Sequence, residues 1–296
     1  MESTEQIYEK VREHYSTASR TTAPKYGESV AKSFGYSEDE LSNIPEDANL
    51  GLSCGNPLAI TSLKEGETVI DLGSGAGFDI FLASTKIGPS GKAIGVDIND
   101  EMLARAEKIK ASRGSSVSNV SFIKGNITSV PLPDGIADII ISNCVINLVP
   151  YEEKKLVFKE MYRLLKPGGR VAVSDILAKK PLPEQLRKDI AMYVGCIAGA
   201  AVVAEYENWF KEAGFKESVI TDTQADLNVY LNTNEDGTKK SGECCGPAAA
   251  VPACCGGDAA KEVEPSCSAT TADGMDVGKT DLNDFVGSYK IFAVKN

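Results

Sequence analysis

Histidine is almost absent from this chain of 296 residues, which contains His14 and no other. The scarcity excludes most zinc sites of the Cys/His type and most acid–base catalysis by histidine. An excess of basic residues is also missing, because 42 acidic residues outnumber 31 basic ones and give a net charge of −11. This balance argues against binding to a nucleic-acid backbone or to an anionic membrane surface.

Long apolar runs are missing as well, and no segment approaches the length of a transmembrane helix. The opening MESTEQIYEK lacks the apolar core of a secretory signal peptide. We therefore expect a cytoplasmic protein in which most of the eight cysteines are thiols. The hydrophobic content of 42% is sufficient for one large domain or two modest ones.

Strand and helix patterns alternate along the central part of the chain. Five apolar runs that predict strands are TVIDLGSG, which runs into glycines, KAIGVDIN, VSFIKGNI, ADIIISNC and RVAVSDIL, and helical patterns lie between most of them. One predicted helix begins at Asn99 or Asp100, and another, YEEKKLVFKEMYRLL, is closed by Gly168 and Gly169. The alternation predicts an α/β fold with parallel strands joined by right-handed crossovers.

The predicted organisation has five parts. They are an N-terminal helical extension over 1–65 with Cys54, a Rossmann-like core over 66–180, a helical segment over 181–233 with Cys196 and a sixth strand, an insertion over 234–280, and a final strand over 281–296. The insertion is predicted to be flexible because it is rich in Gly, Ala, Pro and Cys and poor in large apolar residues.

Three glycines follow the first strand of the core, at Gly73, Gly75 and Gly77 in DLGSGAG. Glycine allows the backbone to approach a ligand closely. Asp97 ends the second strand, 20 residues after Gly77, and Ile98 follows it. A carboxylate at this place can accept hydrogen bonds from ribose hydroxyls, so the pattern predicts a nucleotide-type cofactor. The alternative is a tight turn with a surface acid.

Three cysteines outside the insertion, Cys54, Cys144 and Cys196, form no Cys-x-x-Cys motif. Ligands of open α/β sheets bind at the carboxyl ends of the strands, where Cys144 follows the fourth strand. Taken singly, each cysteine could be a small buried hydrophobe. Three thiols near one edge instead favour a thiophilic ligand such as trivalent arsenic, which carries a lone pair and no proton that a general base would have to remove.

The phrases VIDLGSGAG, GVDIN, LLKPGG and RVAVSD resemble the class I methyltransferases that use S-adenosylmethionine. The resemblance implies a seven-stranded sheet whose last two strands form an antiparallel pair. It also implies a cofactor site in which Asp71 and the three glycines lie along the methionine part, Asp97 holds the ribose, and Asn126 and Ile127 lie near the adenine. Many members have an acid where this chain has Asn126. Asn143 precedes Cys144 and either contacts the methionine part or only forms a turn.

The phrases KYGESVAKSFGYSEDELSNIPEDANLGLSCGNP, SNCVINL and MYVGCIAGA are similar to the arsenite methyltransferases. This resemblance implies methyl transfer to arsenite or methylarsenite bound by Cys54, Cys144 and Cys196, for detoxification. It also implies delivery of arsenic as a glutathione or other thiol conjugate, and a thiol reductant such as glutathione or thioredoxin. Some members use a disulfide with a further upstream cysteine, and none precedes Cys54 in this sequence. We expect a monomer.

One cysteine should become dispensable once the arsenic carries a methyl group, since fewer valences then remain for sulfur. We expect this cysteine to be Cys54, because its loop looks the least anchored. The cysteines of the insertion either capture arsenic or belong to a solvated linker. Two rival functions are a methyltransferase for a small organic acceptor and a thiol-rich metalloid-binding protein.

Overall fold

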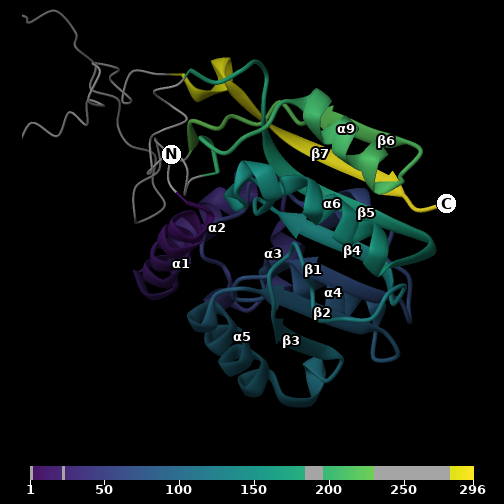
Figure 1. Ribbon diagram of the computed structural model, residues 1–296. Helices are drawn as coiled ribbons and strands as arrows, with labels where there is room; N and C mark the ends of the chain where they lie inside the picture. Colours follow the sequence, from purple (N-terminus) through teal and green to yellow (C-terminus); the bar gives the residue numbers. More distant parts are fainter. Residues whose placement is uncertain (1–2, 22–23, 184–195, 230–280) are drawn as a thin grey trace, which may run out of the picture.

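Seven strands form one sheet in the order β3-β2-β1-β4-β5-β7-β6 (Figure 1). The structure is a computed structural model that describes residues 3–21, 24–183, 196–229 and 281–296. The strands are β1 (Thr68–Leu72), β2 (Lys92–Asp97), β3 (Val120–Lys124), β4 (Ala137–Asn143), β5 (Leu165–Ala178), β6 (Ser218–Asp222) and β7 (Val286–Val294). The first five strands are parallel, whereas β7 runs antiparallel to both β5 and β6. The predicted α/β class and the antiparallel terminal strand are thus confirmed.

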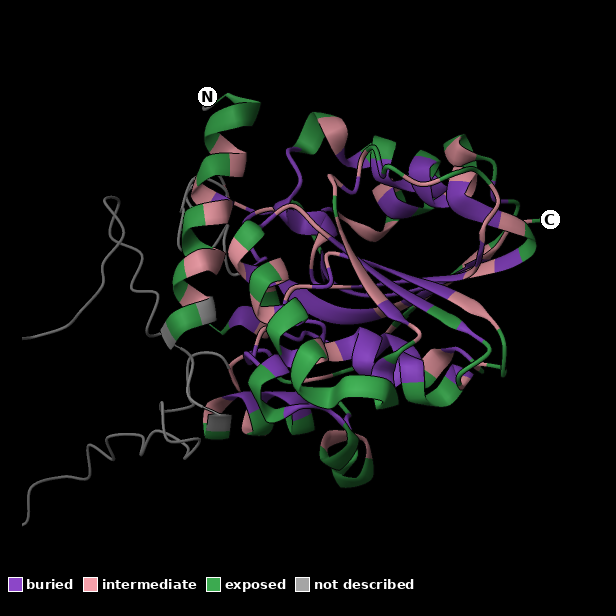
Figure 2. Cartoon of the chain, turned by 90° about the horizontal axis from the view of Figure 1, so that it is seen from below, coloured by how far each residue is buried: buried purple, intermediate pink, exposed green. Residues whose placement is uncertain are grey.

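Helices cover both faces of this sheet. The helices α4 (Phe78–Ile87) and α5 (Asp100–Arg113) share one apolar cluster with alternate strand residues such as Val69. The helices α6 (Lys154–Leu164) and α9 (Val203–Ala213) share another cluster with the neighbouring residue Ile70. Successive strand residues therefore enter opposite cores, as the two-residue period of a strand requires. Figure 2 shows the result, with largely buried strands and helices that keep an exposed outer face.

The helix α6 ends earlier than the sequence predicts. It stops at Leu164, and Leu165 is already extended with φ −71° and ψ 140°. Gly168 and Gly169, the predicted closing residues, lie inside the long strand β5 instead. Pro167 explains the difference, because a proline disfavours helical backbone at the residue before it.

The N-terminal segment covers the end of the sheet where the parallel strands finish. It contains α1 (Thr4–Thr21), α2 (Pro24–Ser33), α3 (Glu38–Asn43) and the short 3₁₀ helices η1 (Glu46–Ala48) and η2 (Pro57–Ile60). Asn99 caps α5, as predicted, by accepting hydrogen bonds from the backbone N–H groups of Glu101 and Met102. Its amide also donates to the carbonyl of Arg12 at 3.0 Å, which fastens α1 to the start of α5.

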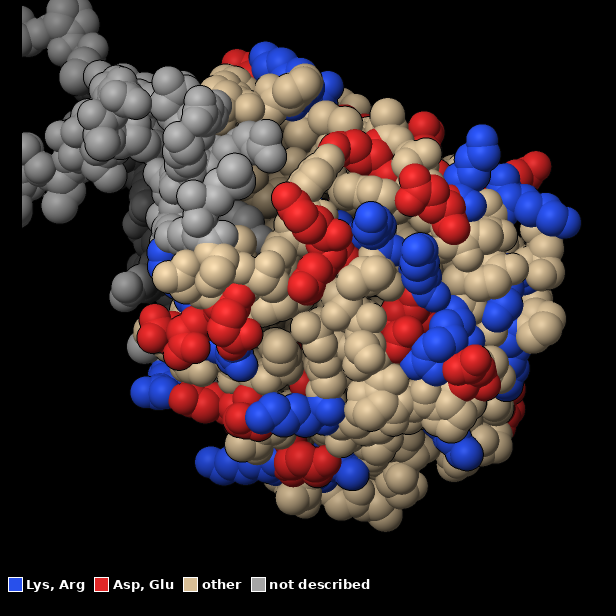
Figure 3. Space-filling model, in the orientation of Figure 1, with Lys and Arg blue, Asp and Glu red and all other residues tan. Residues whose placement is uncertain are grey.

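Two predicted features lie outside the described residues. They are residues 184–195 of the predicted helical segment over 181–233 and the predicted flexible insertion over 234–280 with its cysteines. Among the helices that the structure describes, none combines the length and the apolar character needed to cross a membrane. On the face seen in Figure 3, acidic and basic side chains are interspersed. One example is Arg163, which pairs with both Asp134 and Glu160.

Candidate functional site: a cofactor cavity beside three cysteines

A cavity of about 1060 Å³, counting its open mouth, lies at the carboxyl ends of the parallel strands. Most of the residues predicted to bind a cofactor line it. They are Asp71, Gly73, Gly75, Asp97, Ile98, Asn126, Ile127 and Asn143, together with Cys144. The cavity thus runs from the end of β4, past β1 and β2, to the loop after β3.

The turn after β1 brings bare backbone to the cavity wall. Gly73 has a φ of 82°, and a side chain there would overlap Val145. The Ser74 hydroxyl borders the cavity, is buried, and has no hydrogen-bond partner among the described residues. Because buried polar groups are almost always satisfied, this orphaned hydroxyl fits a polar ligand in the cavity. The sequence reasoning missed it, although it lies between two of the predicted glycines.

Asp97 is held in place by backbone donors. Its carboxylate accepts hydrogen bonds from the N–H groups of Gly75 and Asn99, each at 2.8 Å. Burial raises the pKa of Asp97, while these N–H groups oppose the rise. The carboxylate is therefore fixed at the end of β2, where a ribose could donate to it.

Gly77 does not line the cavity. It has a φ of 93°, and an added side-chain atom would lie 2.7 Å from Phe81 and 2.8 Å from Phe122. Glycine is required there by the packing of α4 against β3 rather than by close approach to a ligand. This placement gives no support to the predicted cofactor role of Gly77.

Acidic groups gather in the cavity. Asp71 and Asp79 both line it along with Asp97, and both are buried. Burial, followed by the charges of Asp79 and Asp97, raises the pKa of Asp71 well above its ordinary value. Burial likewise raises the pKa of Asp79 to about 6, although Tyr36 and Asn143 donate hydrogen bonds to it. Three carboxyl groups in one buried space favour a positively charged ligand.

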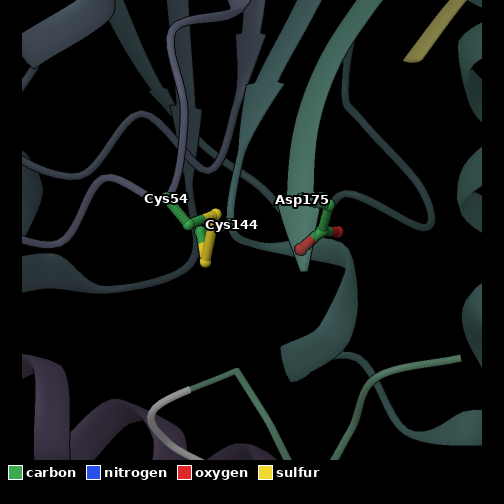
Figure 4. A group of neighbouring side chains, drawn as sticks. All are labelled: Cys54, Cys144 and Asp175. Carbon is green, nitrogen blue, oxygen red and sulfur yellow. A yellow bond between two sulfur atoms is a disulfide. The ribbon is translucent and has the colours of Figure 1, made fainter. Parts of the chain in front are cut away.

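The three cysteines that were predicted to be thiols come together next to this cavity, but the prediction of a free thiol is wrong for two of them. Cys54 and Cys144 are joined as a disulfide with a Cα–Cα distance of 5.7 Å, although 90 residues separate them. The Cys196 sulfur donates to the carbonyl oxygen of Cys144 at 2.8 Å. All three are buried in one apolar cluster. The two bonded sulfurs also lie within 4.8 Å of a carboxylate oxygen of Asp175, which was not predicted (Figure 4).

The backbone of two of these cysteines is unusual. Cys144 has a φ of 59° and Cys196 a φ of 64°, and Gln224 is the one other described residue besides glycines with a positive φ. Residues other than glycine adopt this left-handed backbone conformation at a cost of about 1–3 kcal/mol, and such residues concentrate at functional sites.

Asn143 joins the cavity to the thiols. Its side chain donates to the Gly55 carbonyl at 2.9 Å and accepts from the N–H of Cys54 at 3.2 Å. The Cys54 carbonyl in turn accepts from the Ser288 hydroxyl at 2.6 Å. The loop is therefore anchored on two strands, which gives no support to the premise that it is the least anchored. The structure gives no reason to single out Cys54 as the dispensable cysteine.

Cys196 is a buried thiol that forms no disulfide among the described residues. Burial, reinforced by the negative charge of Asp175, raises the pKa of Cys196 well above its ordinary value. The Tyr15 hydroxyl lies 3.8 Å from the Cys196 sulfur, and Tyr15 also lines the cofactor cavity. One side chain of α1 thus borders both parts of the site.

A family model for a methyltransferase domain matches residues 63–214. The chain belongs to this methyltransferase domain family. The matched residues contain β1 to β5, α9 and the whole glycine turn, which agrees with the predicted class I methyltransferase core.

Curated relatives of this methyltransferase domain include arsenite methyltransferases. The protein of that name from Halobacterium salinarum is 44% identical over 215 residues, which cover 69% of this chain and 54% of the relative. The human one is 35% identical over 185 residues, covering 60% of this chain and 48% of the relative. The chain spans about half the length of these relatives. These matches confirm the resemblance to arsenite methyltransferases that the sequence phrases indicated.

Solved structures share the fold. An arsenic(III) S-adenosylmethionine methyltransferase from Chlamydomonas reinhardtii has a TM-score of 0.55 and 24% identity, covering 93% of this chain and 74% of that chain.

A different activity appears among the curated relatives that match a shorter part of the chain. The ubiquinone/menaquinone biosynthesis C-methyltransferase of Pasteurella multocida is 35% identical over 133 residues, covering 45% of this chain and 48% of the relative.

Residues of α1 are the main part of the methyltransferase cavity that sequence reasoning missed. Tyr8, Arg12 and Tyr15 line it, at a spacing that places them along one side of a helix. The helical period of IYEKVREHYS was visible in the sequence. The surface that this helix covers was not, because that contact is set by the tertiary fold.

Proposed function

We propose that this chain transfers methyl groups from S-adenosylmethionine to trivalent arsenic bound by the thiols of Cys54, Cys144 and Cys196, as a detoxification reaction. The observation that carries the proposal is the meeting of these three distant residues in one buried cluster, with Cys144 on the wall of the cavity. The similarity to arsenite methyltransferases supports the same substrate.

The cavity suits S-adenosylmethionine in shape and charge. Asp97 would accept from the ribose, and the Ser74 hydroxyl would gain a polar partner in the methionine part. Asp71 and Asp79 would lie near the ammonium and sulfonium charges, which favours the cationic donor over its neutral product. When bound, the donor supplies an electrophilic methyl group on a positively charged sulfur.

Arsenic would be loaded by thiol exchange. Each cysteine thiol replaces one thiol ligand of the arriving conjugate, so that an arsenic–sulfur bond forms as another breaks and the proton leaves with the departing thiol. Because the thiolate is the nucleophile and the arsenic ligand, the raised pKa of buried Cys196 requires that its proton passes to the departing thiol as the arsenic–sulfur bond forms. The apolar cluster around the sulfurs excludes water and favours a thiophilic ligand.

The arsenic lone pair then forms the bond to the methyl carbon while the carbon–sulfonium bond breaks. The protein contributes mainly by positioning the two partners. Arsenic is formally oxidised by two electrons in this step, and a thiol reductant such as glutathione or thioredoxin returns it to the trivalent state. The same class of reductant is needed to open the Cys54–Cys144 disulfide before arsenic can bind. We therefore place the reaction in the reducing cytoplasm, with the protein acting as a monomer.

The test is incubation with S-adenosylmethionine, glutathione and arsenite, followed by arsenic speciation. We expect methylated arsenic from the unmodified chain and at least a hundredfold loss with Cys54→Ser, Cys144→Ser or Cys196→Ser, since one sulfur ligand is missing. Ser116→Ala, which removes an exposed hydroxyl away from the cavity, is the control and should keep full activity. Undiminished methylation of arsenic by the three variants would contradict the role of these cysteines as arsenic ligands, and neither arsenite binding nor methylated arsenic with the unmodified chain would favour an organic acceptor. Arsenite binding without any methylated product would favour a metalloid-binding protein.

A further inference from the structure

A second cavity borders the apolar cluster that contains the three cysteines. It measures about 1660 Å³, counting its open mouth, and among the described residues its wall shares none with the cofactor cavity. Ala178, Leu182 and Ala198 line this second cavity and belong to the cysteine cluster. Cys144 and Leu148 belong to the same cluster and line the cofactor cavity. The cluster is therefore reached from two separate cavities.

Two cavities suit two reactants that arrive separately. In the proposed function, on which this inference rests, the methyl donor occupies the cofactor cavity while arsenic exchanges its thiol ligands. Each exchange breaks a bond between arsenic and the sulfur of its carrier, forms a bond to a cysteine sulfur and releases the carrier as a thiol. A carrier that docks in the second cavity can deliver arsenic and leave without displacing the donor.

Lys154 of α6 is a buried positive charge on the wall of the second cavity. The residue is 1% exposed, and its ammonium group donates a hydrogen bond to the carbonyl oxygen of Ile146 at 2.7 Å. An ammonium group has three N–H donors. Within the part of the chain that the structure describes, Lys154 has no further hydrogen bond or ion pair. Two of its donors are therefore left for a ligand.

The charges around this lysine indicate what that ligand carries. Burial lowers the pKa of Lys154 to about 7, although nearby negative charges oppose the fall. These charges come from Asp175, Cys196 and Glu205, so the lysine lies within electrostatic reach of the cysteine cluster. Glu205 and Glu152 are the acids that line the second cavity among the described residues. One buried cation and two acids complement a ligand with both a carboxylate and an ammonium group.

We propose that the second cavity binds the carrier of arsenic, a thiol that has the carboxylate and ammonium groups of an amino acid, as glutathione and cysteine have. Lys154 binds a carboxylate of the carrier, and Glu152 and Glu205 attract its ammonium group. The apolar wall at Ala198 leads from the carrier sulfur to the cysteine cluster. A volume of this size accepts a tripeptide. Thiols of this class are therefore better carriers than an uncharged thiol.

The binding test uses two ligands on the full chain by titration calorimetry, without arsenic. They are S-methylglutathione, a thioether that cannot exchange with arsenic or reduce a disulfide, and its dimethyl ester, which lacks both carboxylates. We expect Lys154→Met to weaken S-methylglutathione by about tenfold or more and the ester by less than about twofold. Lys155→Met is the matched control, because it removes an exposed lysine that does not line the cavity, and it should change neither affinity.

Ala200→Phe is a second variant, which keeps the lysine. Ala200 lines the cavity and is half-buried, so a ring at this position fills space that the carrier needs. We expect it to weaken S-methylglutathione by about fivefold or more. The proposal would be overturned if the unmodified chain did not bind S-methylglutathione, or if Ala200→Phe bound it as well as the unmodified chain. Equal weakening of S-methylglutathione and its ester by Lys154→Met, in a chain that still melts cooperatively, would also overturn it.

The arsenic reaction supplies a second measurement. Lys154→Met should raise the glutathione concentration that gives half the maximal rate of methylation by about tenfold, and leave that of 2-mercaptoethanol, an uncharged thiol, within about twofold. A merely structural role of Lys154 would change both concentrations. A chain that binds S-methylglutathione as expected but methylates no arsenic would contradict the proposed function and not the binding site. Arsenic methylation with an unchanged glutathione dependence in Lys154→Met would contradict the binding site alone.

Discussion

The cofactor end and the thiol end of the site are built in opposite ways. The cofactor end uses short local phrases, with the glycine turn directly after β1 and Asp97 at the end of the next strand. The thiol end joins three segments that are separated by 90 and 52 residues. A local phrase fixes its geometry through the backbone, whereas the thiol end depends on long-range packing. The comparison predicts that the two ends can be damaged independently.

The largest effects on ligand binding should come from one substitution at each end. Asp97→Asn should weaken S-adenosylhomocysteine by about 10- to 100-fold, because it removes a charged acceptor and turns an amide N–H group toward a backbone donor. Cys196→Ser should remove most of the affinity for arsenite. Asp97→Asn should keep its affinity for arsenite within about twofold, and Cys196→Ser should keep its affinity for S-adenosylhomocysteine within about twofold. The reason is that substitutions at distant sites act independently. Calorimetric titration of both ligands on both variants measures this.

Each variant must be shown to be as stably folded as the unmodified chain before these affinities are compared. Thermal melts with an unchanged midpoint would establish that each variant keeps its fold. If Cys196→Ser weakened the binding of S-adenosylhomocysteine as strongly as the binding of arsenite, the two ends of the site would not be separable.

A second prediction concerns the joint between the two ends. Asn143→Ala removes hydrogen bonds to the Gly55 carbonyl, to Asp79 and to the N–H of Cys54. Because these groups are largely buried, the free energy of unfolding should fall by about 2–4 kcal/mol in urea titrations. Asn208→Ala, which loses only an exposed contact to Glu212, should change it by less than about 0.5 kcal/mol. Similar losses in the two variants would mean that Asn143 does not hold the ends together.

The smallest effect is a pH dependence at the cofactor end. Burial raises the pKa of Asp79 from 3.8 to about 6, so the folded state binds its proton more tightly than the unfolded state. The resulting stabilisation is fully present below about pH 3.8 and is lost as the pH rises through about 6. Relative to Asp79→Asn, the unmodified chain should lose about 1–3 kcal/mol between pH 4 and pH 7.

Asp138 offers a control of opposite sign. Burial raises its pKa, but Lys166 and the N–H of Thr68 overcome this and lower it. Its stabilisation is therefore present above pH 3.8 and lost as the pH falls. Urea titrations of Asp79→Asn, Asp138→Asn and the unmodified chain across this range give the slopes. Parallel profiles for Asp79→Asn and the unmodified chain would show that Asp79 ionises as it does in the unfolded state.

Much of the fold was predictable because its signals are local. Apolar runs identified the core strands, Asn99 marked the start of α5, and Gly214 ends α9 as the AEYENWFKEAG pattern suggests. The topology rule for open sheets placed Cys144 at the edge where the cavity lies. The predicted end of α6 was wrong. It relied on Gly168 and Gly169, although Pro167 already disfavours helical backbone at the residue before it.

The rest depends on contacts that no local pattern encodes. Gly77 and Gly75 look alike in sequence, yet one faces the aromatic rings of Phe81 and Phe122 and the other faces the cavity. The anchoring of the Cys54 loop comes from Ser288, which is 234 residues away. The closeness of Asp175 to the sulfurs and the role of α1 as a wall of the cavity have the same origin.

The left-handed backbone at Cys144 and Cys196 sets two demands against each other. A glycine at either position would make the chain easier to fold, because it adopts this conformation without strain. A β-branched residue would hardly fit at all. The main-chain conformation that positions the two sulfur atoms is therefore one that favours glycine. Selection for thermal stability alone would replace both cysteines and remove the thiol chemistry.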